Sequence, residues 1–459
     1  MCGRVKSEPL AIVGGTIIDG NGGPPIDGGV ILIDGKRIVA VADKSLAVPA
    51  EAKIISAAGK YVMPGMMDAN VHLFFAITPD QLIRHEGRYE DIIAEAAQVA
   101  LKSGVTTVFD TWGPREALTH VRDRINRGEL VGSRVFFAGN IIGFGGPTSA
   151  DFFPISRSVM SKTEADTIDF RWEQGVGPDL LWMTPQEVRA RVRSYIQAGH
   201  QDFLKYAASG HTHTDMQFIA FSAEAQHAIV EEGHRAGLTV QAHTTSPESL
   251  RMEIEAGADL LQHCDVTGPV PIPEDTLAVI ARRQIPCAAL FLTRRFLAWD
   301  VAHGLEPGKT FHRIRAENDR RLIIAGAPIL LTTDAGVTSY CSENPQFGSV
   351  ISCDDCPIEL GEAHFRWLEA AEELGMKPMD ALMGATRNIA RAYKVDQNLG
   401  TLEKGKIADI LVLDKNPIEN AAHYRSISLV MKDGRVVERD YPPIPRSLTV
   451  QGAPFVTAC

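Results

Sequence analysis

Eight short apolar runs, separated by stretches with helical periodicity, limit the folds open to this chain. Runs of this length that alternate with amphipathic segments of one helix each indicate βα units forming a parallel sheet. Eight such repeats are the number that closes a (β/α)8 TIM barrel. An open doubly wound sheet is the alternative, but no GxGxxG follows the first run to favour it. The runs begin at Tyr61, Gly104, Arg134, Gln201, Leu238, Ala258, Ile285 and Ala327.

A different pattern occupies both ends of the chain. Residues 8–60 contain short β-branched segments broken by glycine turns, and residues 396–440 repeat this pattern. Such segments predict strands joined by tight turns. We therefore expect a small β-sandwich domain built from both termini, with a catalytic barrel domain at residues 61–395 inserted between its two halves.

The composition is typical of a globular protein that handles a small molecule. Of the 459 residues, 45% are hydrophobic and 22% charged, which excludes a disordered chain or a coiled coil. The formal net charge of −11, without a block of Lys or Arg, leaves no surface for nucleic acid or an anionic membrane. No apolar run could span a membrane, and the N-terminus MCGRVKSEPL lacks an apolar signal segment. We therefore expect a cytoplasmic protein with a small-molecule substrate and no nucleic-acid or membrane partner.

Seven cysteines, an odd number scattered along a long chain, do not form the pattern of a disulfide framework. Cys353 and Cys356 form a CxxC pair with Cys341 nearby. A structural zinc site normally needs a fourth Cys or His at short range, and the sequence offers none. We interpret the segment as a surface loop with free thiols, with a metal site or a disulfide as the alternative.

Polar side chains at the ends of the predicted barrel strands point to a functional site. The first run ends in DANVH, and alternation along a strand turns Asn70 and His72 to the same side. Barrel enzymes place their catalytic groups at these carboxyl ends. A single histidine in an apolar strand is commonly a core residue, but here every polar residue of the set would need its own buried partner. We therefore interpret the set as one site, with members Asn70, His72, Lys205, His243, His263 and Asp334.

The motifs VMPGMMDANVH, FLKYAASG, VQAHTTS, LLQHCD and LLTTDAG follow one another in this order between two β segments. This layout, over residues 10–437, resembles the amidohydrolase superfamily. The resemblance implies that Lys205 is N-carboxylated and bridges two divalent metal ions, as in the prolidase-like and ochratoxinase-like branch. The ligands that it implies are His243 and His263 for one ion, and His72 and Asp334 for the other.

The first strand departs from the family pattern, which usually has His-x-His where this chain has Asn70-x-His72. An amide oxygen is a harder and weaker donor than imidazole, so it should hold a borderline metal less tightly. The ion at this position is then labile, or it is cobalt or manganese instead of zinc. In the alternative, Asn70 touches no metal and that centre is mononuclear.

Metal-assisted hydrolysis is the chemistry that such a set supports. A divalent ion lowers the pKa of coordinated water towards neutrality and polarises a substrate carbonyl. Lys205 as a free ammonium would repel the cations, so it contributes as a ligand only when it is carboxylated. Asp334, as a catalytic carboxylate, would accept the proton of the attacking water and return it to the leaving nitrogen.

The Asn-x-His pair together with Lys205 is similar to that of the bacterial phenylurea hydrolases and of molinate hydrolase, which cleave herbicidal ureas and a thiocarbamate. Our hypothesis is an amidohydrolase that cleaves a C–N bond in a small neutral urea, amide or carbamate. The alternatives are a thiocarbamate hydrolase, a prolidase-like dipeptidase or N-acyl-amino-acid hydrolase, and a non-catalytic binding homologue. By the same resemblance we expect a homo-oligomer.

Four residues outside the metal set are candidates for substrate contact. His211 and His213 form a second His-x-His after the fourth strand, and Arg294 after the seventh could recognise the carboxylate of a dipeptide. Phe291 would instead line an apolar pocket for an aryl urea. The segment 145–184 is longer than a plain βα connection, and its aromatic side chains predict a wall or lid of the pocket.

Overall fold

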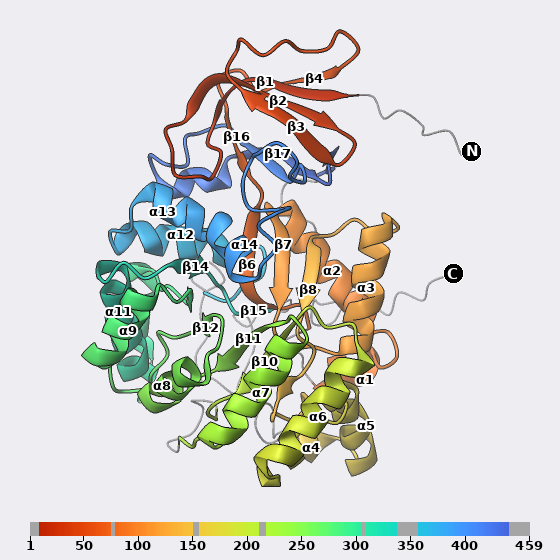
Figure 1. Ribbon diagram of the computed structural model, residues 1–459, viewed down its shortest axis with the longest axis vertical. Helices are drawn as coiled ribbons and strands as arrows, with labels where there is room; N and C mark the ends of the chain where they lie inside the picture. The colour runs from red at the N-terminus through yellow and green to blue at the C-terminus, as the bar shows by residue number, and fades with distance from the viewer. Residues whose placement is uncertain are drawn as a thin grey trace.

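The computed structural model describes residues 9–74, 79–149, 156–210, 217–304, 306, 308–336 and 357–439. Within these residues, each of the eight apolar runs contains at least one β-strand. Figure 1 shows two units, a sheet domain at the top and a larger unit of strands and helices below it. One strand of the first apolar run, β5 (Tyr61–Pro64), belongs to the sheet domain and not to the larger unit.

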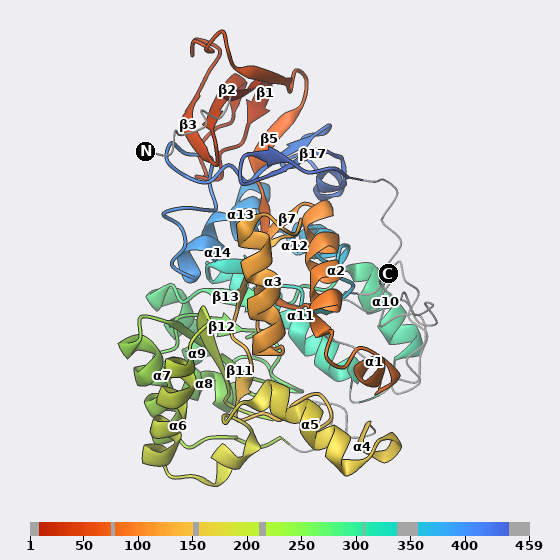
Figure 2. The same cartoon turned by 90° about the vertical axis from the view of Figure 1, so that its right-hand side faces the viewer.

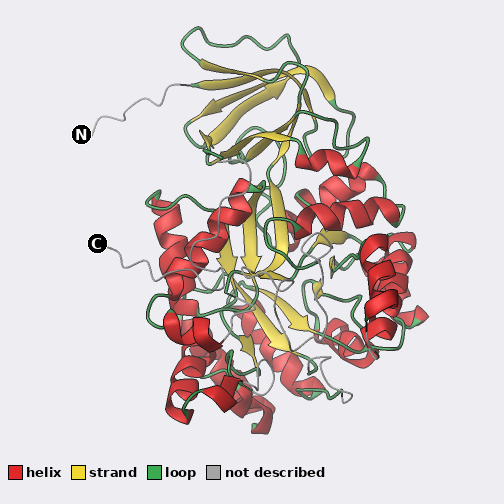
Figure 3. Cartoon of the chain, turned by 180° about the vertical axis from the view of Figure 1, so that it is seen from behind, coloured by secondary structure: helices red, strands yellow, loops and turns green. Residues whose placement is uncertain are grey.

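The larger unit is a parallel barrel. Strands β15, β6, β7 and β8 form one sheet, and β9 to β14 form a second. β8 and β9 belong to one apolar run, as do β14 and β15, and backbone hydrogen bonds from Asp202 N to Phe137 O and from Asp334 N to Asn70 O connect the two sheets at both edges. The predicted (β/α)8 barrel is confirmed, and Figure 3 shows its strands inside a layer of helices. The barrel strands are β6 (Met66–His72), β7 (Val105–Asp110), β8 (Arg134–Phe137), β9 (Ile141–Ile142), β10 (Phe203–Ala207), β11 (Thr239–His243), β12 (Leu261–Gln262), β13 (Cys287–Ala289), β14 (Ile329–Leu331) and β15 (Ala335–Gly336).

Helices cover the barrel because each of the larger ones has an apolar face. In α2, Ile92, Ala96 and Ala100 are buried at helical spacing, and Figure 2 shows α2 and α3 standing together over the strands. Burial of one side chain the size of Ile contributes roughly 1.5–3 kcal/mol. None of the described helices is long and apolar enough to cross a membrane. The helices are α1 (Pro79–Arg84), α2 (Tyr89–Lys102), α3 (Arg115–Arg127), α4 (Ser156–Val159), α5 (Lys162–Glu173), η1 (Pro178–Trp182), α6 (Pro185–Ala198), α7 (Ala223–Arg235), α8 (Pro247–Ala256), α9 (Glu274–Arg283), α10 (Arg294–His303), α11 (Gly308–Ile324), α12 (Ala363–Glu373), α13 (Pro378–Gly384), α14 (Arg387–Ala392) and η4 (Ala421–Arg425).

Both ends of the chain build the smaller unit. Its sheet has the strand order β18-β17-β16-β5-β1-β2-β3, with β4 paired to β1. N-terminal strands therefore lie beside C-terminal strands, drawn in red and blue in Figure 1. Ile12 and Ile31 share a buried cluster with Ile410 and Met431, so neither half of the domain has a core without the other. The strands are β1 (Leu10–Ile17), β2 (Ile26–Asp34), β3 (Arg37–Ala42), β4 (Lys53–Ser56), β5 (Tyr61–Pro64), β16 (Ile410–Leu413), β17 (Ile427–Lys432) and β18 (Arg435–Val436).

The first apolar run is divided between the two units. The sequence pattern predicts that Tyr61–Pro64 belongs to the first barrel strand, but β5 pairs with β1 and β16 in the terminal sheet. The chain crosses to the barrel at Gly65, where an added Cβ would collide with the side chain of Thr106. The run is apolar on both sides of this crossing, so hydrophobicity alone could not reveal the change of sheet.

The segment 145–184, expected to border the pocket, contributes two helices and a 3-10 turn. Trp172 of α5 is buried, and its ring lies 5.3 Å from Phe74 and 6.0 Å from Trp112 between centroids. Trp182, in contrast, is 92% exposed. The segment therefore packs one aromatic side chain beside the ends of the first two barrel strands and leaves another in solvent.

A buried ion-pair cluster joins the two units. Arg134, which begins β8, donates through Nη2 to Asp409 (Oδ2, 3.1 Å) and to Asp433 (Oδ1, 2.9 Å). None of the three side chains is more than 14% exposed. Burial by itself raises the pKa of Asp433, but Arg134 and Lys432 hold that pKa well below its ordinary value. Asp433 is therefore ionised at neutral pH, and the cluster ties the start of a barrel strand to the C-terminal strands.

We predict that Arg134→Ala lowers the free energy of unfolding by about 3 kcal/mol, because it removes the cation that Asp409 and Asp433 share and leaves Asp433 with Lys432 alone. Arg127→Ala is the control, since the Arg127–Glu129 pair is exposed and an exposed ion pair adds little to stability. Urea unfolding at pH 7 measures the free energy of unfolding of both variants. An equal decrease of this free energy in the two variants would contradict the prediction. A carboxyl group with a depressed pKa stabilises the fold above its unfolded-state pKa and loses that contribution as the pH falls. The effect of Arg134→Ala should therefore shrink in acid.

Candidate active site

The six polar residues expected to form one site lie at the carboxyl ends of the barrel strands. Two of them are on β6, one each on β10 and β11, and one each directly after β12 and β14. Five are buried, and the side chain of the sixth, Asp334, is 31% exposed. The fold thus brings to one end of the barrel residues that are far apart in the sequence. They are Asn70, His72, Lys205, His243, His263 and Asp334.

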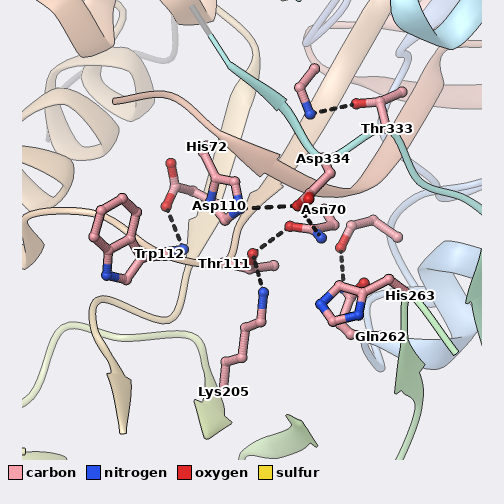
Figure 4. A network of polar contacts seen from close by, with 12 residues as sticks. Asn70, His72, Asp110, Thr111, Trp112, Lys205, Gln262, His263, Thr333 and Asp334 are labelled. Atoms are coloured by element: carbon pink, nitrogen blue, oxygen red, sulfur yellow. Dashed lines mark hydrogen bonds and ion pairs between the residues drawn. The ribbon is translucent and has the colours of Figure 1, made fainter. Parts of the chain in front are cut away.

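A chain of hydrogen bonds connects four strand ends (Figure 4). Lys205 Nζ donates to Thr111 Oγ1 at 3.0 Å, and Thr111 in turn donates to Asn70 Oδ1. Asn70 Nδ2 donates to Asp334 Oδ1 at 2.8 Å, and His72 Nε2 lies 3.0 Å from the same oxygen. In a buried environment such a chain is polarised and directional. It therefore holds the amine, the amide and the carboxylate in fixed orientations.

Asp334 has a backbone conformation that is uncommon outside glycine, with a φ of 55°. Its N–H donates to Asn70 O at 2.9 Å, which ties the eighth strand to the first. A non-glycine residue persists in this region only when its surroundings impose it, and such residues cluster at functional sites. Burial by itself raises the pKa of Asp334, but the hydrogen bond from His72 and the charge of Lys205 lower that pKa well below its usual range. Asp334 is therefore an ionised carboxylate at neutral pH.

His243 and His263 stand edge to face, with ring centroids 4.6 Å apart. His263 Nδ1 lies 3.0 Å from Thr244 O, and since a carbonyl only accepts, this contact places the ring proton on Nδ1. Burial lowers the pKa of His263 to about 4 and also lowers that of His72, so both rings are neutral at pH 7. A neutral imidazole whose other nitrogen bonds a carbonyl is the form that binds metal ions.

Lys205 is 1% exposed in the middle of this cluster. Burial lowers the pKa of Lys205 to about 8, although the carboxylates of Asp334, Asp110 and Glu253 favour its charged form. Buried lysines give up their proton more readily than surface lysines do. The amine of Lys205 is therefore neutral in a substantial fraction of molecules near pH 8, and the neutral amine is the form that reacts with carbon dioxide.

The donor set suits a divalent cation, but its members form two separate pairs. Within the described ranges, no three His, Cys, Asp or Glu side chains lie close enough together to hold a metal ion by themselves. One pair is His72 with Asp334, and the other is His243 with His263. Neutral imidazoles and a carboxylate suit zinc, cobalt and manganese. The residues therefore fit a metal centre in which a further ligand joins the two pairs.

Several buried polar residues that support the site are not among those expected from the sequence. Asp68 accepts from Thr333 Oγ1 (2.6 Å), from Thr333 N (3.2 Å) and from Asn70 N (3.1 Å), so it links the first and eighth strands. Asp110 accepts from Leu73 N at 2.7 Å and holds the turn after the first strand. A polar residue inside an apolar strand is the signal that could have identified them. The supporting residues are Asp68, Asp110, Thr111 and Thr333.

Two of the four expected substrate-contact residues are described by the structure, and both have their partners elsewhere. Phe291 is buried and stacks on Trp367 of α12, with ring centroids 4.7 Å apart, in the wall of the barrel. Arg294 is exposed, and its Nη2 donates to Glu373 O at 2.7 Å. Both residues follow β13 closely in the sequence, but nearness to a strand end does not decide where a side chain points. Outside the described residues lie His211 and His213.

Two aromatic side chains contact the histidines of the cluster. Trp112 lies edge-on to His72 with centroids 6.1 Å apart, and Phe144 lies edge-on to His243 at 5.1 Å. Asn140 connects them, because it accepts from Trp112 Nε1 (3.1 Å) and donates to Phe144 O (2.7 Å). Two aromatic rings therefore lie on the side of the site formed after the second and third strands.

Known proteins of similar sequence and structure point to one family. The Amidohydrolase family model matches residues 61–437. Molinate hydrolase has a solved structure that matches with a TM-score of 0.91 and 38% identity, over 99% of this chain and 100% of that chain. For phenylurea hydrolase B the TM-score is 0.88 and the identity 36%, over 94% of this chain and 97% of that chain. Ochratoxinase from Aspergillus niger is 24% identical over 452 residues, which are 94% of this chain and 87% of that protein. The resemblance stated from the motifs is confirmed.

We predict that Asp68→Ala lowers the free energy of unfolding by about 2–3 kcal/mol, because two buried N–H groups and the Thr333 hydroxyl lose their acceptor. Thr333→Val removes one of the three hydrogen bonds and should cost about 1 kcal/mol. Chemical denaturation of both variants gives the comparison. If the two losses are equal, the carboxylate of Asp68 does not have the supporting role described here.

Proposed function

The chain belongs to the amidohydrolase family, and on this premise we propose that it is a metal-dependent hydrolase of a C–N bond in a small neutral urea, amide or carbamate. The observation that carries the proposal is the identity of 38% and 36% to molinate hydrolase and phenylurea hydrolase B over nearly the whole chain. The Asn70-x-His72 pair leads to the same two enzymes from the sequence alone. Because one fold supports many activities, this likeness at the site counts for more than the barrel itself.

Divalent metal ions are in general use in the amidohydrolase family, and the donors of this chain fit them. Bound here, two ions would lower the pKa of the attacking water and polarise the substrate carbonyl. We propose that Lys205 is carboxylated and supplies the anionic ligand that joins the two pairs of donors. Zinc, cobalt and manganese all match the donor types, and an amide ligand makes one ion the more labile. The proposed ligands are His243 and His263 for one ion, His72, Asp334 and Asn70 for the other, and carboxylated Lys205 for both.

Asp334 is the residue that we assign to proton transfer. Both His72 Nε2 and Asn70 Nδ2 contact its Oδ1, so Oδ2 is the oxygen assigned to take the proton of the attacking water. The partial exposure of the Asp334 side chain favours access of water and substrate. The same oxygen would return the proton to the leaving nitrogen, which departs as a neutral amine.

The charge of the surroundings favours a neutral substrate over a dipeptide. A dipeptidase needs a cation near its pocket to bind the free carboxylate of the substrate. The guanidinium of Arg294, our sequence-based candidate for that task, is engaged with Glu373 instead. The side of the site with Trp112 and Phe144 is apolar and suits an aryl or alkyl group.

A thiocarbamate is the second candidate substrate. Molinate hydrolase matches over the full length of both chains and shares slightly more identity with this chain than phenylurea hydrolase B does. The same nucleophile and the same polarised carbonyl would serve a thiocarbamate, whose leaving groups are an amine and a thiol. The choice between the substrates depends on the walls of the pocket and not on the metal ligands.

We predict that hydrolysis is found for aryl or dialkyl ureas or for thiocarbamates, and not for dipeptides, when protein of known metal content is screened. Treatment with a chelator should abolish turnover, and zinc, cobalt or manganese should restore it. Amine release is the measurement. Hydrolysis of dipeptides alone would contradict the proposed function. So would the absence of any hydrolysis by protein that retains its metal.

We predict that Lys205→Ala lowers kcat/KM by at least about 100-fold, because even the loss of a residue that supports a metal ligand costs 10–100-fold. Short carboxylic acids should restore part of the activity by supplying the missing anionic oxygens. Lys394→Ala removes an exposed lysine paired with Asp259 and should leave activity unchanged. Full activity of Lys205→Ala without added acid would contradict a bridging role.

A further inference from the structure

We propose that Thr111 is a positioning residue that sets the direction of both Lys205 and Asn70. This inference rests on the proposed metal-dependent function and adds a residue to it. Thr111 is fully buried directly after β7, and its N–H donates to Val71 O of the neighbouring strand at 3.1 Å. In Figure 4 its hydroxyl lies between the lysine and the amide. The backbone therefore fixes the hydroxyl before any ligand is bound.

The direction of each hydrogen bond follows from what each group can donate. Asn70 Nδ2 donates to Asp334 Oδ1, which His72 Nε2 also contacts, so the amide nitrogen of Asn70 is turned towards Asp334. Asn70 Oδ1 then faces Thr111, whose single hydroxyl proton goes to that oxygen. The lone pairs of Thr111 Oγ1 are left for the N–H of Lys205, 3.0 Å away. Each group in this chain thus has one assignment, and Thr111 is the member that contacts both the amide of Asn70 and the amine of Lys205.

The same arrangement is compatible with a carboxylated Lys205. A carbamate nitrogen keeps one hydrogen, so Thr111 can accept from Nζ before and after carboxylation. With that hydrogen directed to Thr111, the two carbamate oxygens are free for other partners. Asn70 Oδ1 has a second lone pair, so it can accept from Thr111 and still face a cation. Thr111 would therefore lower the cost of ordering two ligands while touching neither the metal nor the substrate.

The β7 strand offers a matched control for this proposal. Thr107 is also fully buried on β7, but its hydroxyl has no hydrogen-bond partner among the described residues. Thr107→Val and Thr111→Val make the same change of side-chain shape and polarity. Thr107→Val removes no hydrogen bond to a described residue, whereas Thr111→Val removes the hydrogen bonds to Lys205 and Asn70. Thr111→Ser keeps the hydroxyl and removes only a methyl group. Together the three variants separate the hydroxyl of Thr111 from general packing of the strand.

The test measures metal affinity and carbamate content, so it does not depend on knowing the substrate. Competition with a chromophoric chelator gives the apparent Kd of the full chain for Co²⁺, and ¹³C NMR after loading with ¹³C-bicarbonate reports the lysine carbamate. We expect Thr111→Val to weaken Co²⁺ binding by about 10–100-fold, the usual effect of removing a residue that orients a metal ligand. Its carbamate signal should fall in parallel. The apparent Kd of Thr111→Ser for Co²⁺ should stay within about threefold of the parent value, and the apparent Kd of Thr107→Val should match the parent value.

Three results would overturn the proposal. Parental affinity in Thr111→Val would show that its hydroxyl does not position the ligands. Equal weakening in Thr111→Ser would assign the effect to the methyl group, and equal weakening in Thr107→Val would assign it to packing of the strand. If the parent itself binds no Co²⁺, the proposed function fails and this inference fails with it. If the parent binds Co²⁺ and Thr111→Val binds it with the same affinity, only the role of Thr111 is overturned and the proposed function stands.

Discussion

The contacts made by Asp334 Oδ1 are the ones on which the candidate site depends. This oxygen meets both His72 Nε2 and Asn70 Nδ2, and the Asp334 N–H returns a hydrogen bond to Asn70 O. The partners are 264 residues apart, and no turn joins the first and eighth strands directly. The contacts that join the first strand to the eighth therefore also orient the carboxylate of Asp334.

Burial of charge decides the form in which these groups exist. Lys205 is the cation of the cluster, Asp334 is held as an anion, and burial keeps His72 and His263 neutral. The attraction between the opposite charges of Lys205 and Asp334 offsets part of the desolvation cost of burying them. Carboxylation of Lys205 would replace the positive charge by a negative one, and the unbalanced negative charge would then attract divalent cations. The ion pairs of Arg134 solve a similar problem at the junction with the terminal sheet.

The expectation of convergence at one end of the barrel concerns residues that differ in polarity from their neighbours in the sequence. Asn70 and Lys205 interrupt apolar runs, and a strand end in a parallel barrel has one location, so their convergence could be expected. Phe291 and Arg294 follow a strand end without interrupting it, and their side chains have partners outside the cluster. Tyr61–Pro64 was assigned to the wrong sheet because pairing partners are not encoded in hydrophobicity.

The amino-acid sequence by itself determined the number of βα units, the terminal origin of the small domain and the polar residues at the strand ends. These properties are local, since they follow from the alternation of side chains and from the cost of burying a polar group in an apolar run. Only the tertiary structure decided that Thr111 joins Lys205 to Asn70 and that Asp68 joins the first strand to the eighth. A hydrogen bond between distant residues depends on distance and direction in space, and neither is a property of a residue's neighbours in the chain.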